Sequence, residues 1–194
     1  RRAAPPRPAG ELPRERVAVR DPAALLAIWQ DTLEQLCAAL DGRHPDDKLP
    51  WGGPDMAVGR FAAARLMEIW AHGQDIYDLL RQPRRHSERI RFIADLGVRT
   101  YRWTFANRGI SVPDVRPFID LASPSGGRWT WNPPNDEQCV TGSAVEFCQV
   151  VTQVRNVADT ALQVRGTAAT QWMALAQCFA GVPRDPPAKG ARAW

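Results

Sequence analysis

The spacing of hydrophobic residues changes near Gly109, and this change limits the folds that the chain can adopt. Before Gly109, apolar side chains recur every three or four residues, which is the period of a helix with one buried face. The helices predicted from this period cover residues 21–40, 55–81 and 87–105. Asp21 and Pro22 suit the first turn of a helix, and glycines such as Gly42 suit the position after a last turn.

The residues after Gly109 combine strand and helix patterns. Residues 116–122 and 128–132 flank a turn rich in Ser, Pro and Gly, which predicts a β-hairpin. The other elements predicted here are strands over residues 139–141 and 160–165 and helices over residues 143–156 and 167–181. The fold class is therefore predicted as α+β, with an incomplete helical bundle followed by a small α+β subdomain.

Composition divides the chain into four predicted parts. Residues 1–20 are rich in Pro and Arg and bury too little apolar surface to order themselves, so they are predicted to be a disordered lead. The helical part covers residues 21–109, and the α+β subdomain covers residues 110–183. Residues 184–194 are polar and contain proline, which predicts a frayed tail.

The overall composition is that of a globular protein in a reducing compartment. Hydrophobic residues make up 44% of the chain, which is enough for a core. The four cysteines form no CxxC pair, no apolar run reaches the roughly 18–20 residues that span a bilayer, and no signal-peptide core follows the first arginines. The net charge of +4 comes largely from arginines near both ends, without a clustered reading element for nucleic acid. We therefore expect a cytoplasmic protein that has neither a membrane nor a nucleic-acid partner.

Glu68 and His72 lie four residues apart in the second predicted helix, so both side chains face one side of it. Arg65 and Asp75 fall on the same stripe, and four ionisable groups are costly to bury unless they surround a polar or metal-filled cavity. Gly73 leaves room beside His72 for a backbone or a ligand. An imidazole and a carboxylate suit zinc or another first-row divalent ion, although a third protein ligand is still required. The alternative is an ion pair on a partly exposed helix.

Three further residues are candidates for the same chemistry. Arg65 suits a bidentate clamp for a substrate carboxylate, and its alternative is a salt bridge to Glu68. Asp75 can orient the ring of His72 as a hydrogen-bond acceptor, and its alternative is an ordinary surface carboxylate. Arg155 lies within a mostly apolar predicted helix, so it needs an anionic partner or an exit to solvent.

Two stretches of the chain resemble actinobacterial metal-binding proteins related to the mycothiol-dependent maleylpyruvate isomerases, in the DinB/YfiT-like superfamily. The first is Pro-Trp-Gly-Gly-Pro-Asp-Met at residues 50–56, followed by Arg-Leu-Met-Glu-Ile-Trp-Ala-His-Gly-Gln-Asp-Ile at residues 65–76. The second comprises residues 147–153 and 158–162, which resemble the C-terminal part of the same group. The resemblance extends over residues 21–181.

The resemblance implies a DinB-like four-helix bundle with a divalent metal, usually zinc or nickel. Its ligands would be a histidine of the first long helix and the Glu and His of a later helix, and Glu68 and His72 match the last two. The first histidine has no counterpart here, because that helix would precede Arg1. We therefore interpret the chain as a fragment of a longer protein or as a shortened relative with an incomplete site. Trp51, in the first matching segment, is the candidate cofactor-binding residue.

The resemblance also implies thiol chemistry on the metal. A mycothiol-type thiol would add to an activated double bond, after which rotation and elimination give isomerisation, whereas retention of the adduct gives thiol transfer. Arg65 and Arg155 would hold the carboxylates of a small-molecule substrate. The favoured function is thus a divalent-metal-binding, thiol-dependent isomerase or transferase. The alternatives are a non-catalytic protein that binds a small molecule or a partner, and an inactive truncated relative.

Overall fold

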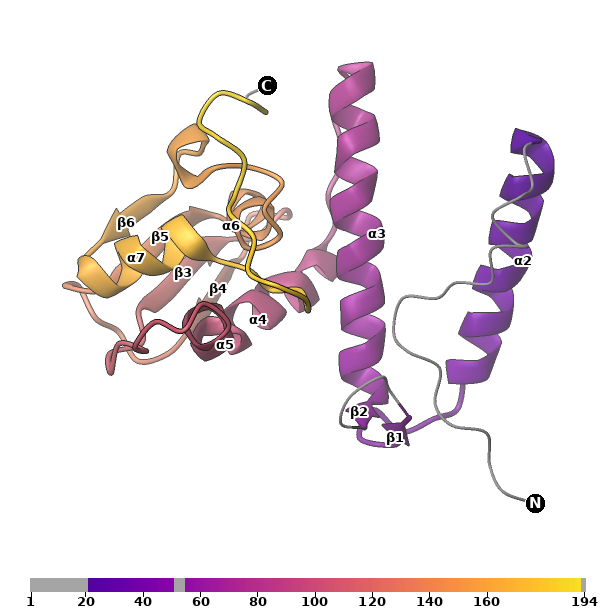
Figure 1. Cartoon of the computed structure of the whole chain (residues 1–194), viewed down its shortest axis with the longest axis horizontal. Coiled ribbons are helices and arrows are strands. Elements are labelled where there is room, and N and C mark those ends of the chain that lie inside the picture. Colours follow the sequence, from indigo (N-terminus) through magenta and orange to yellow (C-terminus); the bar gives the residue numbers. More distant parts are fainter. Residues whose placement is uncertain (1–20, 51–54, 193–194) are drawn as a thin grey trace. The chain divides into compact units, whose positions relative to one another are not determined.

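A computed structural model describes residues 21–50 and 55–192 of the chain. The chain divides into two compact units, of which one ends at Ala62 and the other begins at Ala63. Helices come first along the chain and a small sheet follows (Figure 1), which confirms the α+β class. The compact units do not divide at residues 109–110, where the change of pattern had placed a boundary. The predicted lead, residues 1–20, lies outside the described residues.

The first unit contains α2 (Pro22–Leu40), whose predicted cap is confirmed. The Asp21 carboxylate accepts hydrogen bonds from the amides of Ala23 and Ala24, at 3.3 and 3.1 Å, and Pro22 occupies the first turn. Asp41 caps the other end, and Gly42 follows with a φ of 71°, a conformation that glycine adopts without strain. No residue of α2 is buried, and four of its large apolar side chains are exposed: Leu25, Leu26, Ile28 and Trp29.

A short antiparallel pair of strands follows α2 in the first unit. β1 (Lys48–Leu49) pairs with β2 (Met56–Ala57), in a region where the sequence predicted a loop and the start of a helix. α3 (Val58–Leu80) begins directly after β2. The amide of Val58 donates to the Asp47 carbonyl at 2.9 Å, and the amide of Gly59 donates to the Pro45 carbonyl at 2.8 Å. These loop carbonyls satisfy amides that the first turn of a helix leaves unpaired.

The second unit continues α3 and adds a helical segment in three pieces. These are η1 (Glu88–Ile90), α4 (Arg91–Arg99) and α5 (Tyr101–Ala106), where the sequence predicted one helix. The break falls at Thr100, whose hydroxyl donates to the Leu96 carbonyl at 2.8 Å. Such a bond from a threonine to the preceding turn competes with the helix and bends it.

A four-stranded sheet forms the centre of the second unit. β3 (Phe118–Ala122) and β4 (Arg128–Trp131) form the predicted antiparallel hairpin, with Leu121 opposite Trp129. β5 (Cys139–Ser143) pairs in parallel with β3, and β6 (Gln163–Arg165) pairs antiparallel with β5, which gives the order β4-β3-β5-β6. Ile119, Leu121 and Val140 are fully buried, so this sheet presents one apolar face to the core.

Two helices, α6 (Ala144–Val151) and α7 (Thr167–Leu175), complete this core, and both are shorter than predicted. α6 ends at Thr152, whose hydroxyl donates to the Cys148 carbonyl at 2.7 Å. Beyond α7 the described chain has no further helix or strand, and the amide of Cys178 donates to the Val151 carbonyl at 2.9 Å. Aromatic rings fill the interior, since Trp172 packs edge-on against other buried side chains: Tyr101 at 5.1 Å and Phe147 at 5.8 Å between ring centroids.

α4 and α6 approach closely because a glycine lies where they meet. A Cβ atom at Gly97 would lie 2.8 Å from Cγ2 of Val151, closer than carbon atoms pack. Val151 is itself buried in the core that α4 and α6 share with the sheet. The helices before residue 109 and the sheet after it therefore share one core, which explains why the second unit includes both.

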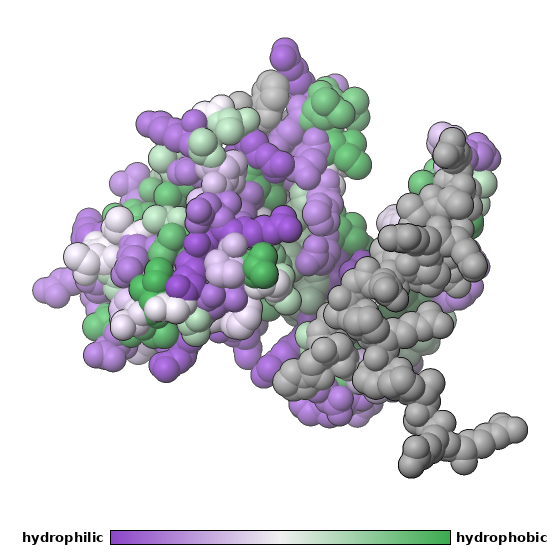
Figure 2. Space-filling model, viewed as in Figure 1, coloured by the Kyte–Doolittle hydropathy of each residue, from purple (hydrophilic) through white to green (hydrophobic). Residues whose placement is uncertain are grey.

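The surface retains apolar side chains at the C-terminal end of α3. Figure 2 shows hydrophobic side chains gathered there, and the exposed ones are Ile76, Leu79 and Leu80. Within residues 21–50 and 55–192, none of the helices combines the length and the apolar character that crossing a membrane requires.

Candidate functional site

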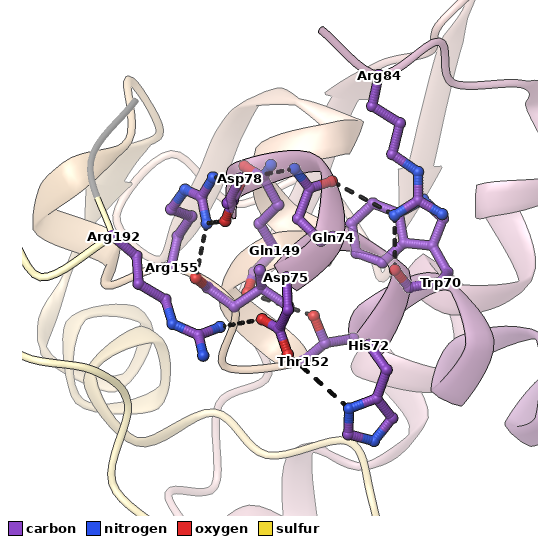
Figure 3. Close-up of polar contacts among 11 residues, drawn as sticks. Trp70, His72, Gln74, Asp75, Asp78, Arg84, Gln149, Thr152, Arg155 and Arg192 are labelled. Atoms are coloured by element: carbon purple, nitrogen blue, oxygen red, sulfur yellow. Dashed lines mark hydrogen bonds and ion pairs between the residues drawn. The ribbon is translucent and has the colours of Figure 1, made fainter. Parts of the chain in front are cut away.

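Three ionisable side chains follow one face of α3 in the second unit. Oε2 of Glu68 lies 3.3 Å from Nε2 of His72, as the spacing of four residues predicted. On the other side of the ring, Oδ2 of Asp75 lies 4.0 Å from Nδ1 of His72 (Figure 3). The imidazole therefore lies between two carboxylates, each of which faces a different ring nitrogen.

The Glu68–His72 pair is open to solvent. The side chain of His72 is 78% exposed and that of Glu68 is 39% exposed. In the part of the chain that the structure describes, no three His, Cys, Asp or Glu side chains come together in a way that could hold a metal ion. A structural or catalytic zinc site needs at least three protein ligands, so these two residues supply part of such a site. Metal binding by Glu68 and His72 stays a prediction.

A pocket of about 530 Å³ lies against this face of α3. Glu68, His72 and Asp75 contribute to one wall, together with the buried Met67. The opposite wall comes from the C-terminal part of the chain, through residues of the segment 179–192. The candidate ligands therefore face a cavity that is large enough for a small molecule.

The C-terminal wall of the pocket is a segment, residues 181–192, that we call the strap. Residues 184–192, which the sequence predicted as part of a frayed tail, make specific contacts here. Nη1 of Arg192 lies 2.6 Å from Oδ1 of Asp75, so the strap meets α3 beside His72 (Figure 3). The amide of Gly190 donates to the Asp159 carboxylate at 2.8 Å. Composition alone did not reveal these contacts, because each partner lies far away in the sequence.

Arg155 forms an ion pair with a carboxylate of the protein itself. Its Nη1 and Nη2 atoms donate to the two oxygens of Asp78, at 2.6 and 2.7 Å, and both side chains are largely buried (Figure 3). Burial opposes ionisation of Asp78, but hydrogen bonds from Arg155 and Gln74 outweigh it and lower the pKa of that carboxyl. The expected anionic partner of Arg155 is thus Asp78, and the guanidinium is not presented to the pocket. A role of Arg155 in substrate binding stays a prediction.

The other predicted site residues are placed differently. Arg65 is exposed and forms no ion pair with any residue that the structure describes, so the alternative of a bridge to Glu68 is not observed. Trp51, the candidate cofactor-binding residue, lies outside the described residues. Two arginines that sequence reasoning had assigned to the tail, Arg184 and Arg192, line the pocket instead. A strap of Pro-rich sequence gives no periodic signal from which their position could have been found.

The space beside Gly73 is filled by an arginine. A Cβ atom at Gly73 would lie 3.3 Å from Nη2 of Arg84. Nη1 of Arg84 donates to the Trp70 carbonyl at 2.6 Å, and its guanidinium lies 5.1 Å from the ring centroids of both Trp70 and Tyr77. The glycine therefore admits a cation–π contact within the protein rather than a ligand.

All four cysteines are free in the structure. Cys148 and Cys178 are buried, and burial raises the pKa of each thiol. Cys37 is exposed on α2. The buried thiols act as small apolar core residues. The apolar neighbours of Cys37 in the sequence also suggested a buried position, which its exposure on α2 contradicts.

The fold and the pocket define a class: an α+β protein with a Glu–His pair on a long helix that faces a cavity. The sequence model of the family described as "Mycothiol maleylpyruvate isomerase N-terminal domain" matches residues 1–77, which include both members of that pair. Residues 1–77 therefore match the mycothiol maleylpyruvate isomerase-like family, which is the family that the resemblance had indicated.

The relatives that match over a longer span are themselves described only as uncharacterized. Two uncharacterized proteins of Mycobacterium tuberculosis, from different strains, are each 43% identical to the chain over 172 residues. The matched region covers 86% of this chain and 65% of each relative, so the chain spans about two thirds of their length. No solved structure matches the chain.

Proposed function

We propose that the chain is a divalent-metal-binding protein that works with a low-molecular-weight thiol of the mycothiol type, as an isomerase or a transferase. The family match of residues 1–77 supports the link to mycothiol. The observation that carries the proposal is the position of Glu68 and His72, whose ligand atoms lie 3.3 Å apart at the wall of a pocket of about 530 Å³. A small-molecule substrate fits a cavity of this size.

The donor atoms suit a borderline metal ion. A carboxylate oxygen and an imidazole nitrogen are ligands for zinc, and nickel accepts the same set. Asp75 faces the other ring nitrogen of His72, where a carboxylate orients a ligating imidazole. The described residues supply two ligands, and we assign the third to a part of the protein that the structure does not describe. When bound, the metal would supply positive charge that lowers the pKa of a coordinated thiol.

The arginines of the strap suit the recognition of a substrate carboxylate. Arg184 and Arg192 line the same pocket as Glu68 and His72. Arg192 is paired with the partly exposed Asp75, whereas the pair of Arg155 with Asp78 is largely buried. A guanidinium binds a carboxylate through two parallel hydrogen bonds, which fixes the orientation of the ligand. In this proposal the strap arginines take over the role that the sequence had given to Arg65 and Arg155.

Zinc titration by calorimetry tests the metal part of the proposal. The wild-type chain is expected to show a saturable site, and Glu68→Ala and His72→Ala are each expected to weaken it at least about tenfold, since each removes a direct ligand. His44→Ala is the matched control, because His44 is an exposed histidine outside the pocket. The proposal would be contradicted if the wild-type chain showed no saturable zinc site. It would also be contradicted if His72→Ala bound zinc as tightly as His44→Ala does.

A second measurement separates catalysis from binding. The metal-loaded protein is mixed with a mycothiol-type thiol and a small unsaturated dicarboxylate, and isomerised product and thiol adduct are followed by mass spectrometry. Product that disappears in His72→Ala supports the isomerase or transferase. Saturable metal binding without any product would instead favour the alternative of a non-catalytic binding protein.

A further inference from the structure

The strap is held unevenly along its length. Its first part, residues 181–187, is fixed by side chains that belong to the core or lie close against it. Gln177, which is 1% exposed, accepts from the amide of Arg184 at 2.9 Å and donates to the Val182 carbonyl at 3.2 Å. Gln153 donates to the Arg184 carbonyl at 2.6 Å, and Asn156 donates to the Pro187 carbonyl at 2.9 Å.

Two polar contacts between described residues attach the second part of the strap, residues 188–192, to the rest of the unit. One is the pair of hydrogen bonds from the Gly190 amide to the Asp159 carboxylate, at 2.8 and 3.0 Å. The other is the ion pair of Arg192 with Asp75, whose side chains are 41% and 45% exposed. Exposed ion pairs contribute little to stability and are weakened by salt, because water and ions screen them.

Residues 188–192 lie beside the ionisable side chains of α3. Arg192, Glu68, His72 and Asp75 line one pocket, and Met67, which is 2% exposed, lines it as well. Asp75 contacts Arg192 through Oδ1 and faces His72 through Oδ2. A movement of residues 188–192 therefore changes both the opening of the pocket and the surroundings of the imidazole.

We propose that residues 188–192 form a latch that opens and closes this pocket, while residues 181–187 stay in place. The moving part begins after Pro186 and Pro187, whose fixed φ angles stiffen the chain up to that point. Release of the Arg192–Asp75 pair opens the latch. The proposal concerns access to the pocket and holds whether or not a metal binds there.

Methionine oxidation measures the open state directly. Peroxide oxidises a methionine according to its exposure, so Met67 is expected to react from the open latch. Met173, which is 1% exposed in the core and outside the pocket, reports global unfolding in the same sample. Arg192→Ala is expected to speed the oxidation of Met67 about twofold to fivefold, the range that an exposed ion pair supports, with Met173 unchanged.

Two further comparisons make the test specific to the latch. Lys189→Ala is the matched control, because it removes a positive charge from the same segment and the Lys189 side chain forms no hydrogen bond or ion pair with another described residue. Hydrogen exchange of the Gly190 amide is expected to quicken in Arg192→Ala and to stay as in wild type in Lys189→Ala. Raised ionic strength is expected to quicken Met67 oxidation in the wild type and to have little effect in Arg192→Ala.

Several results would overturn the latch. Unchanged Met67 oxidation together with unchanged Gly190 exchange in Arg192→Ala would show that the ion pair does not hold the segment. An equal rise at Met173 would show that Arg192 supports the whole fold. An effect of Lys189→Ala as large as that of Arg192→Ala would attribute the change to net charge.

Discussion

Replacement of Arg155 by methionine is expected to destabilise the second unit strongly. The change removes two hydrogen bonds to Asp78, of 2.6 and 2.7 Å, and leaves a carboxylate that is 13% exposed without its counter-ion. Loss of one partner of a buried pair costs about 3–5 kcal/mol. Because Asp78 keeps a 2.8 Å hydrogen bond from Gln74, we expect the lower end, about 3 kcal/mol.

Urea unfolding followed by circular dichroism measures this loss. With a slope of roughly 2 kcal/mol per molar urea, the midpoint of Arg155→Met is expected to fall by about 1.5 M. The double variant Arg155→Met/Asp78→Leu removes both charges and is expected to recover most of the loss, since an apolar pair needs no counter-ion. Arg128→Met is the control, because Arg128 forms an exposed pair with Asp120 and its loss is expected to be much smaller.

The loss of stability in Arg155→Met is expected to depend on pH. The pKa of Asp78 in the folded protein lies below its ordinary value of 3.8, so its contribution to stability is complete above that value. The contribution is lost as the pH falls through the lower, folded pKa, and it is absent in Arg155→Met. The stability difference between the two proteins is therefore expected to narrow in acid. If Arg155→Met lost less than about 1 kcal/mol of stability at neutral pH, or if the double variant were less stable than Arg155→Met, this reasoning would be refuted.

Two other predictions concern the core and the thiols. Gly97→Ala is expected to lower the free energy of unfolding by about 1–3 kcal/mol by overpacking, since the new Cβ would lie 2.8 Å from Val151, and Gly97→Ala/Val151→Ala should be more stable than Gly97→Ala alone. A thiol reagent followed by peptide mass spectrometry is expected to label Cys37 quickly in the native protein and Cys148 and Cys178 only after denaturation, because the last two are buried with raised pKa values. Equal labelling rates would contradict the core position of these two thiols.

Features that depend on neighbouring residues could be predicted from the sequence. The Asp21 cap, the hairpin of β3 and β4 and the Glu68–His72 contact each follow from spacings of a few residues, and the structure confirms them. In each case the geometry of a single helix or turn brings the side chains together. The helical period also predicted the helices before residue 109, although it did not show the break at Thr100, where a side-chain hydroxyl donates to the preceding turn.

Features that depend on distant residues could not be predicted in this way. Arg155 clearly needed a counter-ion, but its partner Asp78 lies 77 residues away, and several carboxylates were available. Arg192 and Asp75 are 117 residues apart, so the wall that the strap adds to the pocket has no local signature. Tertiary packing decides such contacts, and one sequence contains no record of which pairs form.

The course of the strap also determines how this protein should be purified for metal measurements. Arg192 lines the pocket beside Glu68 and His72, so a polyhistidine tag fused after residue 194 would be separated from a pocket residue by only two residues. Its imidazoles would then be within reach of the candidate ligands and would bind zinc or nickel on their own account. An affinity tag that is cleaved off, with its removal verified by mass, avoids a binding signal that belongs to the tag.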